Sequence, residues 1–421
     1  MEERVILHSD FNSFYANIEC LYDPSLRNRP MAVTGNVQKR HGIVLSKNEP
    51  AKKCGVKTGE VLWQAKKKCP DIVFITARHS LYTEISKKSR EIYLNTFSSQ
   101  VEPFGLDECW LDVSGSLLGN GREIADKIRK TMRDEMGLTV SVGVSFNKVF
   151  AKLGSDIKKP DATTVITREN FKDTIWKLPV NKLLYVGPAT YRKLKRYWIC
   201  TIGDLAQADP EFLYLILGKN GVMLWHFANG RDNSAVTDYY NSTPVIKSVG
   251  NSTTTPYDLI TEDQIKITLY SLSESVAERL RDQNSLCSTV QIGIRDRELK
   301  WFERQEKLKR PSCNTQDIFN LAFSLVIKNK PEKPIRSLSV RACGLTPRGE
   351  VVQLSLFPEE IKNIKRQDLD MAIDKIRSRF GYHSIKRGIA YLEPALSLDA
   401  KSDNIQGGFL VENRGFRIEN K

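Results

Sequence analysis

Apolar and polar positions at the start of the chain alternate between the spacing of strands and that of helices. Apolar runs or strict alternation predict strands, whereas apolar residues three or four positions apart predict helices. Strands are expected at Val5–Ser9, Met31–Thr34, Ile43–Ser46, Pro70–Ile75, Val101–Gly105, Cys109–Val113 and Thr139–Ser145. Helices are expected at Asn12–Leu21, Leu62–Lys68, Leu81–Phe97, Gly121–Met136 and Lys148–Ile157. The βαββαβ order predicts an α/β layer that contains antiparallel strands and carries helices on one face.

Further along, the pattern changes twice. Residues 171–230 are rich in helical spacing, and the polar stretch 231–243 after them is typical of a linker. One more helix, Gln367–Phe380, precedes a polar tail that we expect to be partly disordered. Between these segments a second α+β unit is predicted, with helices at Thr261–Asn284 and Thr315–Ile327 and strands at Ser288–Ile294, Glu298–Lys307 and Ile335–Leu345.

Composition narrows the class of protein. The 421 residues predict two to four domains, and the net charge of +14 favours a polyanionic partner, either nucleic acid or an acidic membrane surface. The acidic N-terminus excludes an ordinary secretory signal, and no stretch approaches the roughly 18 apolar residues of a membrane helix. Eight cysteines without any CxxC pair support neither a zinc site nor a redox motif. We therefore expect a cytoplasmic protein with reduced cysteines and no membrane span.

Three acidic residues fall where predicted strands end. Asp10 follows the apolar run VILHS, while Asp107 and Glu108 lie in the turn between two strands. Carboxylates at one edge of a sheet repel each other, so a divalent cation would neutralise them, and two magnesium ions could promote phosphoryl transfer. Taken singly, each acid is more simply explained as the cap of a turn or helix, and Asp112 is interpreted as a turn partner near Ser114.

The segments SDFNSFYANIE, FGLDECWLDVSG and SVGVSFNKVFAKLGSDIKKP occur in that order. They resemble the palm motifs of Y-family DNA polymerases, the group that includes bacterial DNA polymerase IV and the UmuC-like enzymes, and the resemblance runs from Val5 to about Leu396. It implies low-fidelity, translesion DNA synthesis from dNTPs on a primer-template. It also implies a multidomain α+β right-hand fold. The expected parts are a ferredoxin-like palm (1–21 and 80–168), small fingers (22–79), a helical thumb (169–237), a linker (238–246), an α+β little finger (247–346) and a C-terminal segment (347–421).

The resemblance assigns roles at the active site. Asp10 and Asp107 would bind two Mg²⁺ ions, Glu108 the catalytic ion, and the Phe11 carbonyl the nucleotide-side ion. Phe14 and Tyr15 would contact the nucleotide, with Tyr15 as the steric gate against a 2′-hydroxyl. Lys159 would reach the triphosphate. The alternatives are a core aromatic for Tyr15 and a solvated helix end for Lys159.

The segment SKNEPAKKCGVKTGE resembles the fingers segment over the nucleotide, but it departs from the usual pattern. Glu49 and Lys52 stand where many members carry tyrosine and arginine, whereas Ser46 retains a hydroxyl. Lys52 offers a point charge without the bidentate fork of arginine, and Glu49 is expected to face away from the phosphates. The departure bears on nucleotide affinity rather than on the reaction. Without this context, Lys52 would be interpreted as part of a solvated basic helix face.

Two further regions are predicted to grip DNA. Leu183–Leu194 resembles a helix-hairpin-helix, in which the turn at Gly187 would present backbone N–H groups to a phosphate; an ordinary helix–turn–helix packing unit is the alternative. The little finger carries basic residues that would bind phosphates without sequence preference, although glutamates interleave. The residues expected at the DNA are Arg295, Arg297, Lys300, Arg336 and Arg341.

The pentapeptide Gln353–Phe357, QLSLF, resembles the motif by which bacterial polymerases attach to the sliding clamp. Leu354, Leu356 and Phe357 would fill an apolar pocket and Gln353 would hydrogen-bond at its rim; a strand packed on its own domain is the alternative. Two other functions stay open for the chain, an inactive DNA- and clamp-binding adaptor and a nucleotidyl cyclase. We expect the protein to act as a monomer.

Overall fold

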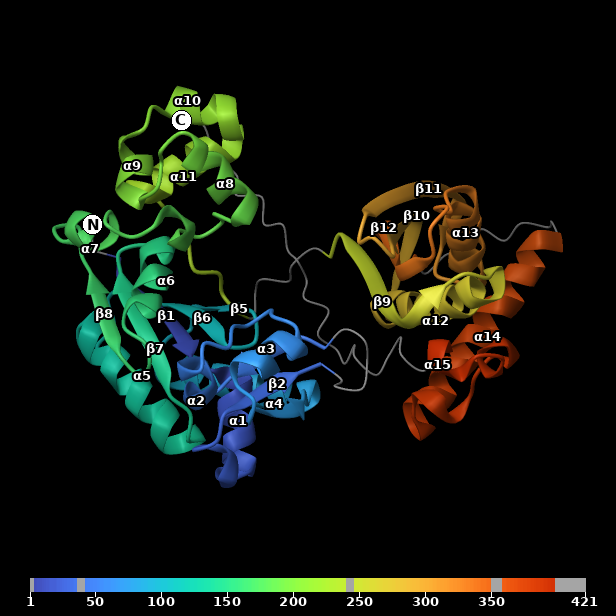
Figure 1. Cartoon of the computed structure of the whole chain (residues 1–421), viewed down its shortest axis with the longest axis horizontal. Helices are drawn as coiled ribbons and strands as arrows, with labels where there is room; N and C mark the ends of the chain where they lie inside the picture. Colours follow the sequence, from blue (N-terminus) through green and yellow to red (C-terminus); the bar gives the residue numbers. More distant parts are fainter. Residues whose placement is uncertain (1–3, 36–41, 240–245, 350–357, 398–421) are drawn as a thin grey trace. The chain divides into compact units, whose positions relative to one another are not determined.

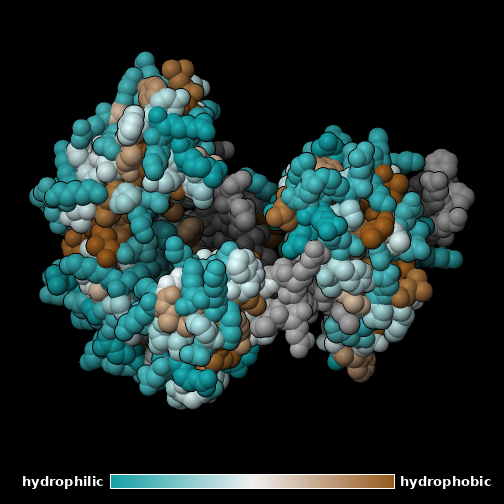
Figure 2. Space-filling model, viewed as in Figure 1, coloured by the Kyte–Doolittle hydropathy of each residue, from teal (hydrophilic) through white to brown (hydrophobic). Residues whose placement is uncertain are grey.

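The computed structural model describes residues 4–35, 42–239, 246–349 and 358–397, with side chains in the last range from Ile364 onward. Its contacts separate two compact units, residues 1–34 with 43–243 and residues 35–42 with 244–421 (Figure 1). In both units hydrophilic side chains cover most of the visible face (Figure 2). The finer boundaries of palm, fingers, thumb and little finger stay predictions. In the described residues no helix is long and apolar enough to cross a membrane.

The first unit is built on a five-stranded sheet of order β5-β6-β1-β7-β8. All neighbouring strands are antiparallel except β7 and β8. The central strand is buried along its whole length, including its polar residues His8, Ser9 and Asp10. The mixed α+β class is thereby confirmed. The strands are β1 (Ile6–Phe11), β5 (Val101–Phe104), β6 (Glu108–Asp112), β7 (Val140–Ser145) and β8 (Thr163–Ile166), the last of which was not predicted.

Helices cover both faces of this sheet, so the prediction of helices on one face is wrong. Leu7 of β1 packs in a core with α1 (Phe14–Tyr22), α4 (His79–Thr96) and α5 (Gly121–Met136). The preceding residue, Ile6, packs on the opposite face with Ala151 of α6 (Lys148–Ile157). The helix α6 lies directly on β7, because a Cβ at Gly143 would come within 1.9 Å of the Ala151 carbonyl oxygen. Only glycine permits this approach.

A small three-stranded sheet of order β3-β2-β4 interrupts the first unit along the sequence. Its strands are β2 (Met31–Thr34), β3 (Val44–Lys47) and β4 (Val73–Thr76), joined by α2 (Glu49–Lys53) and α3 (Leu62–Lys68). The buried Asn48 caps α2 by accepting a hydrogen bond from Ala51 N, and its amide donates to the carbonyls of Leu26 and Arg29. This one side chain therefore fixes where the unpredicted helix α2 begins.

Residues 171–228 are helical and share one core with Val149, Phe150 and Leu153 of α6. The helix α9 begins with a reciprocal capping box between Thr201 and Asp204, which satisfies the first free N–H groups of the helix. The elements are α7 (Phe171–Ile175), η2 (Val180–Lys182), α8 (Pro188–Arg196), α9 (Ile202–Gln207), α10 (Pro210–Leu217) and α11 (Lys219–Ala228).

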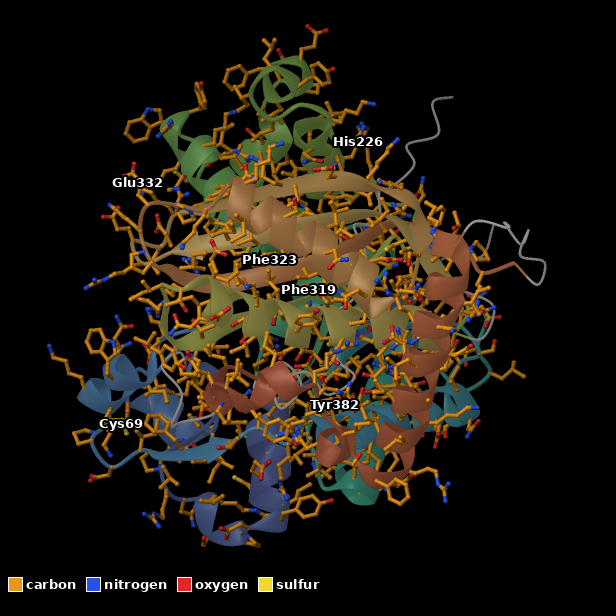
Figure 3. All side chains as sticks on the ribbon, turned by 90° about the vertical axis from the view of Figure 1, so that its right-hand side faces the viewer. Cys69, His226, Phe319, Phe323, Glu332 and Tyr382 are labelled. Carbon is orange, nitrogen blue, oxygen red and sulfur yellow. The ribbon has the colours of Figure 1, made fainter. Side chains whose placement is uncertain are left out.

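The second unit has a four-stranded antiparallel sheet of order β11-β10-β12-β9, with two helices on one face. Tyr270 and Phe319 stack between these helices with ring centroids 3.5 Å apart, and Phe323 follows one turn on (Figure 3). The elements are β9 (Ser248–Leu259), α12 (Glu262–Asp282), β10 (Ser285–Asp296), β11 (Trp301–Ser312), α13 (Thr315–Lys328) and β12 (Ile335–Pro347). Of these, β9 was not predicted.

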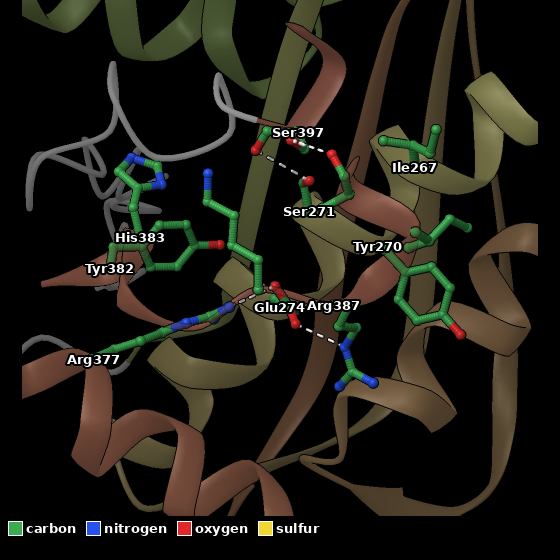
Figure 4. A pocket seen from close by; sticks show the side chains of 12 residues that line it. Ile267, Tyr270, Ser271, Glu274, Arg377, Tyr382, His383, Arg387 and Ser397 are labelled. Carbon is green, nitrogen blue, oxygen red and sulfur yellow. Dashed lines mark hydrogen bonds and ion pairs between the residues drawn. The ribbon is translucent and has the colours of Figure 1, made fainter. Parts of the chain in front are cut away.

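The C-terminal helices are attached to the second unit by buried charges. These are α14 (Pro358–Phe380), which begins well before the predicted Gln367, η3 (Tyr382–Ser384), η4 (Gly388–Tyr391) and α15 (Pro394–Ser397). Glu274 of α12 accepts from Arg377 at 3.1 Å and from Arg387 at 2.7 Å (Figure 4). Arg281 donates to Asp374 at 2.6 Å. Because breaking one partner of a buried pair leaves an uncompensated charge, this segment is an integral layer of the unit.

Candidate active site

The strand register brings the three predicted acids to one edge of the sheet. Asp10 on β1 lies directly opposite Glu108 on β6, and the Phe11 N–H donates to the Asp107 carbonyl at 3.0 Å. Side chains of directly opposed residues lie about 5 Å apart. Asp10 and Glu108 also share the sheet face that α6 covers. Asp10 lies four positions after Ile6 and Glu108 lies two positions before Trp110, and strand residues an even number of positions apart point to the same face.

Two lysines neutralise this acidic edge. Lys159 Nζ lies 2.7 Å from Asp10 Oδ2 and 2.7 Å from Asp156 Oδ1. Lys152 Nζ binds Glu108 Oε2. Lys152 belongs to α6 and Lys159 follows it, so the close approach of α6 to β7 delivers both ammonium groups to the acids.

Burial and neighbouring charges perturb the pKa of each acid. Burial, followed by repulsion from Glu108, raises the pKa of Asp10 to about 7, although Lys159 opposes the shift. Burial and Glu108 likewise raise the pKa of Asp107 to about 6. For Glu108, burial disfavours the charged form, but His8 and Lys152 outweigh it and lower the pKa to about 2. Glu108 therefore stays ionised, whereas Asp10 and Asp107 gain or lose a proton near neutral pH.

The donor chemistry at this edge fits a hard divalent cation. The three carboxylates supply only oxygen ligands, they are largely buried, and each raises the cost of ionising another. Among the described residues, no group of three or more acidic, histidine or cysteine side chains closes around one point. The lysines hold Asp10 and Glu108 instead, so a cation would have to take over part of their charge compensation.

The aromatic residues of α1 lie beside the acids. Tyr15 is half-buried and stacks on Tyr82 of α4, with centroids 4.2 Å apart and planes 13° apart. Burial, followed by the charge of Asp107, raises the pKa of Tyr15. Phe14 is only 3% exposed and packs on Phe11, so Tyr15 is the more accessible of the two rings predicted at the nucleotide.

The fingers residues show how the departure at Glu49 is accommodated. The Glu49 carboxylate pairs with Lys52 Nζ at 3.1 Å on the exposed surface of α2. Ser46 accepts a hydrogen bond from the backbone N–H of Ala16 at 3.4 Å, which joins β3 to α1. An exposed pair of this kind contributes less than about 1 kcal/mol, so Lys52 is easily released to another anion.

The predicted DNA contacts lie in both units. Gly187 is the N-cap of α8, and a Cβ there would meet open space. In the second unit Arg295, Arg297, Lys300 and Arg341 are exposed, and Arg336 is half-buried. The acids Asp258 and Glu298 lie 3.9 Å and 3.4 Å from Arg297 and Lys300. The predicted clamp residues Gln353–Phe357 lie outside the described residues.

Two groups at the acidic edge were not singled out from the sequence. His8 and Lys152 both contact Glu108, from β1 and α6. The signal for His8 was a polar residue inside an apolar strand, two positions before Asp10, and the signal for Lys152 was its place one helical turn after Lys148.

Comparison with known proteins identifies the family. Residues 9–156 match the impB/mucB/samB family, and residues 246–356 match the C-terminal domain of that family. DNA polymerase IV of Acetivibrio thermocellus is 52% identical over 398 residues, covering 94% of this chain and 99% of the relative. DNA polymerase IV of Clostridium acetobutylicum is 36% identical, covering 92% and 98%.

The fold comparison agrees with the sequence comparison. A chimera of the Y-family polymerases Dbh and Dpo4 matches with a TM-score of 0.71 at 24% identity, over 82% of this chain and 99% of the chimera. A post-insertion binary complex of Dbh DNA polymerase matches with a TM-score of 0.55 over 82% and 99%.

These comparisons define the class as Y-family polymerase, and the chain belongs to the impB/mucB/samB family. It is a DNA-directed DNA polymerase of the kind that carries out translesion synthesis. Such polymerases use divalent metal ions. Neither the inactive adaptor nor the nucleotidyl cyclase is favoured.

Proposed function

We propose that Asp10, Asp107 and Glu108 hold two Mg²⁺ ions at which a primer 3′-hydroxyl is joined to an incoming dNTP. The observation that carries this proposal is the register of Asp10 against Glu108, together with the hydrogen bond from the Phe11 N–H to the Asp107 carbonyl. When bound, the ions would activate the hydroxyl and stabilise the leaving pyrophosphate. Asp10 and Asp107 would hold both ions, Glu108 would help to hold the catalytic one, and the Phe11 carbonyl the nucleotide-side one.

The lysines would exchange partners as substrate arrives. Lys159 is only about a quarter exposed and is shared by Asp10 and Asp156. Once cations neutralise Asp10, the ammonium group of Lys159 becomes available for a triphosphate, which carries more charge than a single carboxylate. Lys52 can leave Glu49 in the same way, while Ser46 offers a hydroxyl on the adjoining strand.

The metal assignment predicts a pH-dependent affinity. Carboxylates must lose their protons before they bind Mg²⁺, and the pKa values of Asp10 and Asp107 are about 7 and about 6. Mg²⁺ affinity should therefore rise between pH 6 and pH 8 by about tenfold and then level off. Calorimetry on the enzyme–DNA complex with a non-hydrolysable dNTP would measure it, and Asp10→Asn should flatten the profile. An affinity that does not change over this range contradicts the assignment.

The grip on the primer-template would be electrostatic and independent of sequence. The turn at Gly187 presents the N-terminus of α8 to one backbone phosphate, and the exposed arginines of β10 and β12 line part of the sheet face away from α12 and α13. Since the substrate is DNA, we place the enzyme in the cytoplasm, where it would act as a monomer.

We also propose that Gln353–Phe357 binds the sliding clamp. Truncating its aromatic anchor by Phe357→Ala should weaken clamp binding by about 2 kcal/mol, which is roughly 30-fold. Primer extension stimulated by the clamp should fall accordingly, whereas extension without the clamp should be unchanged. The matched control is Phe380→Ala at the exposed end of α14. Equal loss of basal and stimulated synthesis would indicate that Phe357 packs on its own domain.

A further inference from the structure

His8 lies directly behind the Glu108 carboxylate, in the middle of the central strand. Its side chain is fully buried and lies opposite Trp110 in the register of β1 and β6, with ring centroids 5.1 Å apart and planes at 62°. Glu108 is two residues before Trp110 and therefore points to the same face. The imidazole ring is thus enclosed between the sheet and α6 and has little freedom to rotate.

Both ring nitrogens of His8 face polar groups. Nδ1 lies 2.9 Å from the Ser155 hydroxyl oxygen, and Nε2 lies 3.1 Å from Glu108 Oε2. The second contact is within ion-pair distance, although its alignment falls short of a full hydrogen bond. A buried donor without a partner costs about 1–3 kcal/mol. The charged groups that act on the ring are Glu108, Lys152 and Asp156, and Glu108 is the carboxylate that Nε2 faces.

Glu108 determines which ring nitrogen carries the proton. A carboxylate can only accept a hydrogen bond, so the proton of a neutral ring belongs on Nε2, the nitrogen that lies 3.1 Å from Glu108 Oε2. Nδ1 is then an acceptor for the Ser155 hydroxyl, whose oxygen lies 2.9 Å from it. The same hydroxyl lies 2.8 Å from the Lys152 carbonyl oxygen, to which it can donate instead.

The contacts of Glu108 distinguish its two oxygens. In the part of the chain that the structure describes, His8 and Lys152 both approach Oε2. Of the two carboxylate oxygens, Oε1 is then the one left for a cation. An imidazole that fixes a carboxylate in this way sets the direction of its free oxygen, as outer-shell partners do at metal sites generally.

We propose that His8 is a positioning residue for the polymerase reaction, whose Nε2–H fixes Glu108 Oε2 and so directs Oε1 toward the catalytic cation. Ser155 supports this role by holding Nδ1 on the other side of the ring. The inference rests on the proposed metal role of Glu108, and it assigns no contact of His8 with substrate.

A pair of amide substitutions separates positioning from packing. The amide nitrogen of glutamine falls near the place of imidazole Nε2, whereas that of asparagine falls near Nδ1. His8→Gln therefore keeps the donor to Glu108, and His8→Asn keeps only the side toward Ser155. Steady-state primer extension, thermal unfolding, and calorimetric Mn²⁺ binding to the complex with DNA and a non-hydrolysable dNTP would be measured for both.

His8→Asn should lower kcat and weaken Mn²⁺ binding by about 10–100-fold, with the nucleotide KM changed less than about twofold. His8→Gln should stay within about threefold of the unsubstituted enzyme in both respects. Equal losses in the two variants, or a loss expressed in KM alone, would overturn the inference. Should both variants fail to fold, Ser155→Ala still decides, since a retained kcat and Mn²⁺ affinity in that variant contradict the role. Activity retained by Asp107→Asn would instead refute the metal assignment itself.

Discussion

Asp107→Asn is expected to abolish primer extension while leaving DNA binding intact. The amide keeps the size of the side chain but removes a charge from the edge where Asp10 and Glu108 meet. Metal ions contribute several kcal/mol of transition-state stabilisation in phosphoryl transfer, so the rate should fall by roughly 10³-fold or more. Single-turnover extension of a labelled primer measures the rate, and fluorescence anisotropy measures the affinity for the primer-template.

Asp112→Asn is the matched control for this prediction. Asp112 lies at the other end of the same strand, where it accepts hydrogen bonds from the backbone N–H and the hydroxyl of Ser114. Its substitution removes the same charge at a turn away from the acidic edge and should leave extension within about threefold. If Asp107→Asn extends primers as well as Asp112→Asn does, the three acids do not hold the catalytic ions.

Tyr15→Ala is expected to admit ribonucleotides. The Tyr15 ring is half-buried and stacks on Tyr82, and α1, which carries it, follows the strand of Asp10. In the proposed site this ring would lie beneath the sugar of the incoming nucleotide. Removing the ring removes the surface that would exclude a 2′-hydroxyl, which is worth about 1–3 kcal/mol, or roughly 10–200-fold in discrimination. The ratio of kcat/KM for a dNTP to that for the matching ribonucleotide should fall by this factor.

The control for the gate is Tyr22→Ala, at the end of the same helix. Tyr22 is 61% exposed, and Arg78 lies over its ring, so its loss removes an aromatic residue without opening the site. Tyr82→Phe is a second comparison, since it keeps the stacking surface and loses only the hydroxyl that donates to Glu19. Unchanged sugar discrimination in Tyr15→Ala would mean that another side chain forms the gate.

The fold was predictable where periodicity is strong. Gly121–Met136 and Lys148–Ile157 have the predicted bounds, because both carry sustained apolar spacing and clear end signals, such as Asn120 with Glu123 and the left-handed Gly137. The strand β9 was not predicted because its sequence, SVGNSTTTPYDL, is mostly polar and contains a proline. Such a sequence is tolerated because β9 lies at the edge of its sheet. The helix α2 is too short to show a period.

The acidic edge was predictable in composition but not in its contacts. The position of Asp10 after an apolar strand and of Asp107 between two strands indicated a common edge. Lys159 is 149 residues from Asp10 in sequence, and its contact depends on Gly143 allowing α6 to lie on β7. The same packing brings Lys152 and Ser155 to Glu108 and His8. No local pattern encodes such contacts, since they arise from how the layers stack.

The buried attachment of α14 means that the second unit cannot be shortened at the end of its sheet without loss. Glu274 and Arg281 lie on α12, and their partners Arg377, Arg387 and Asp374 come from the C-terminal helices. A chain cut after Pro347 would leave both α12 charges buried without these partners, which costs about 3–5 kcal/mol for each broken pair. A truncated polymerase that ends with β12 should therefore unfold at a lower temperature than the full chain.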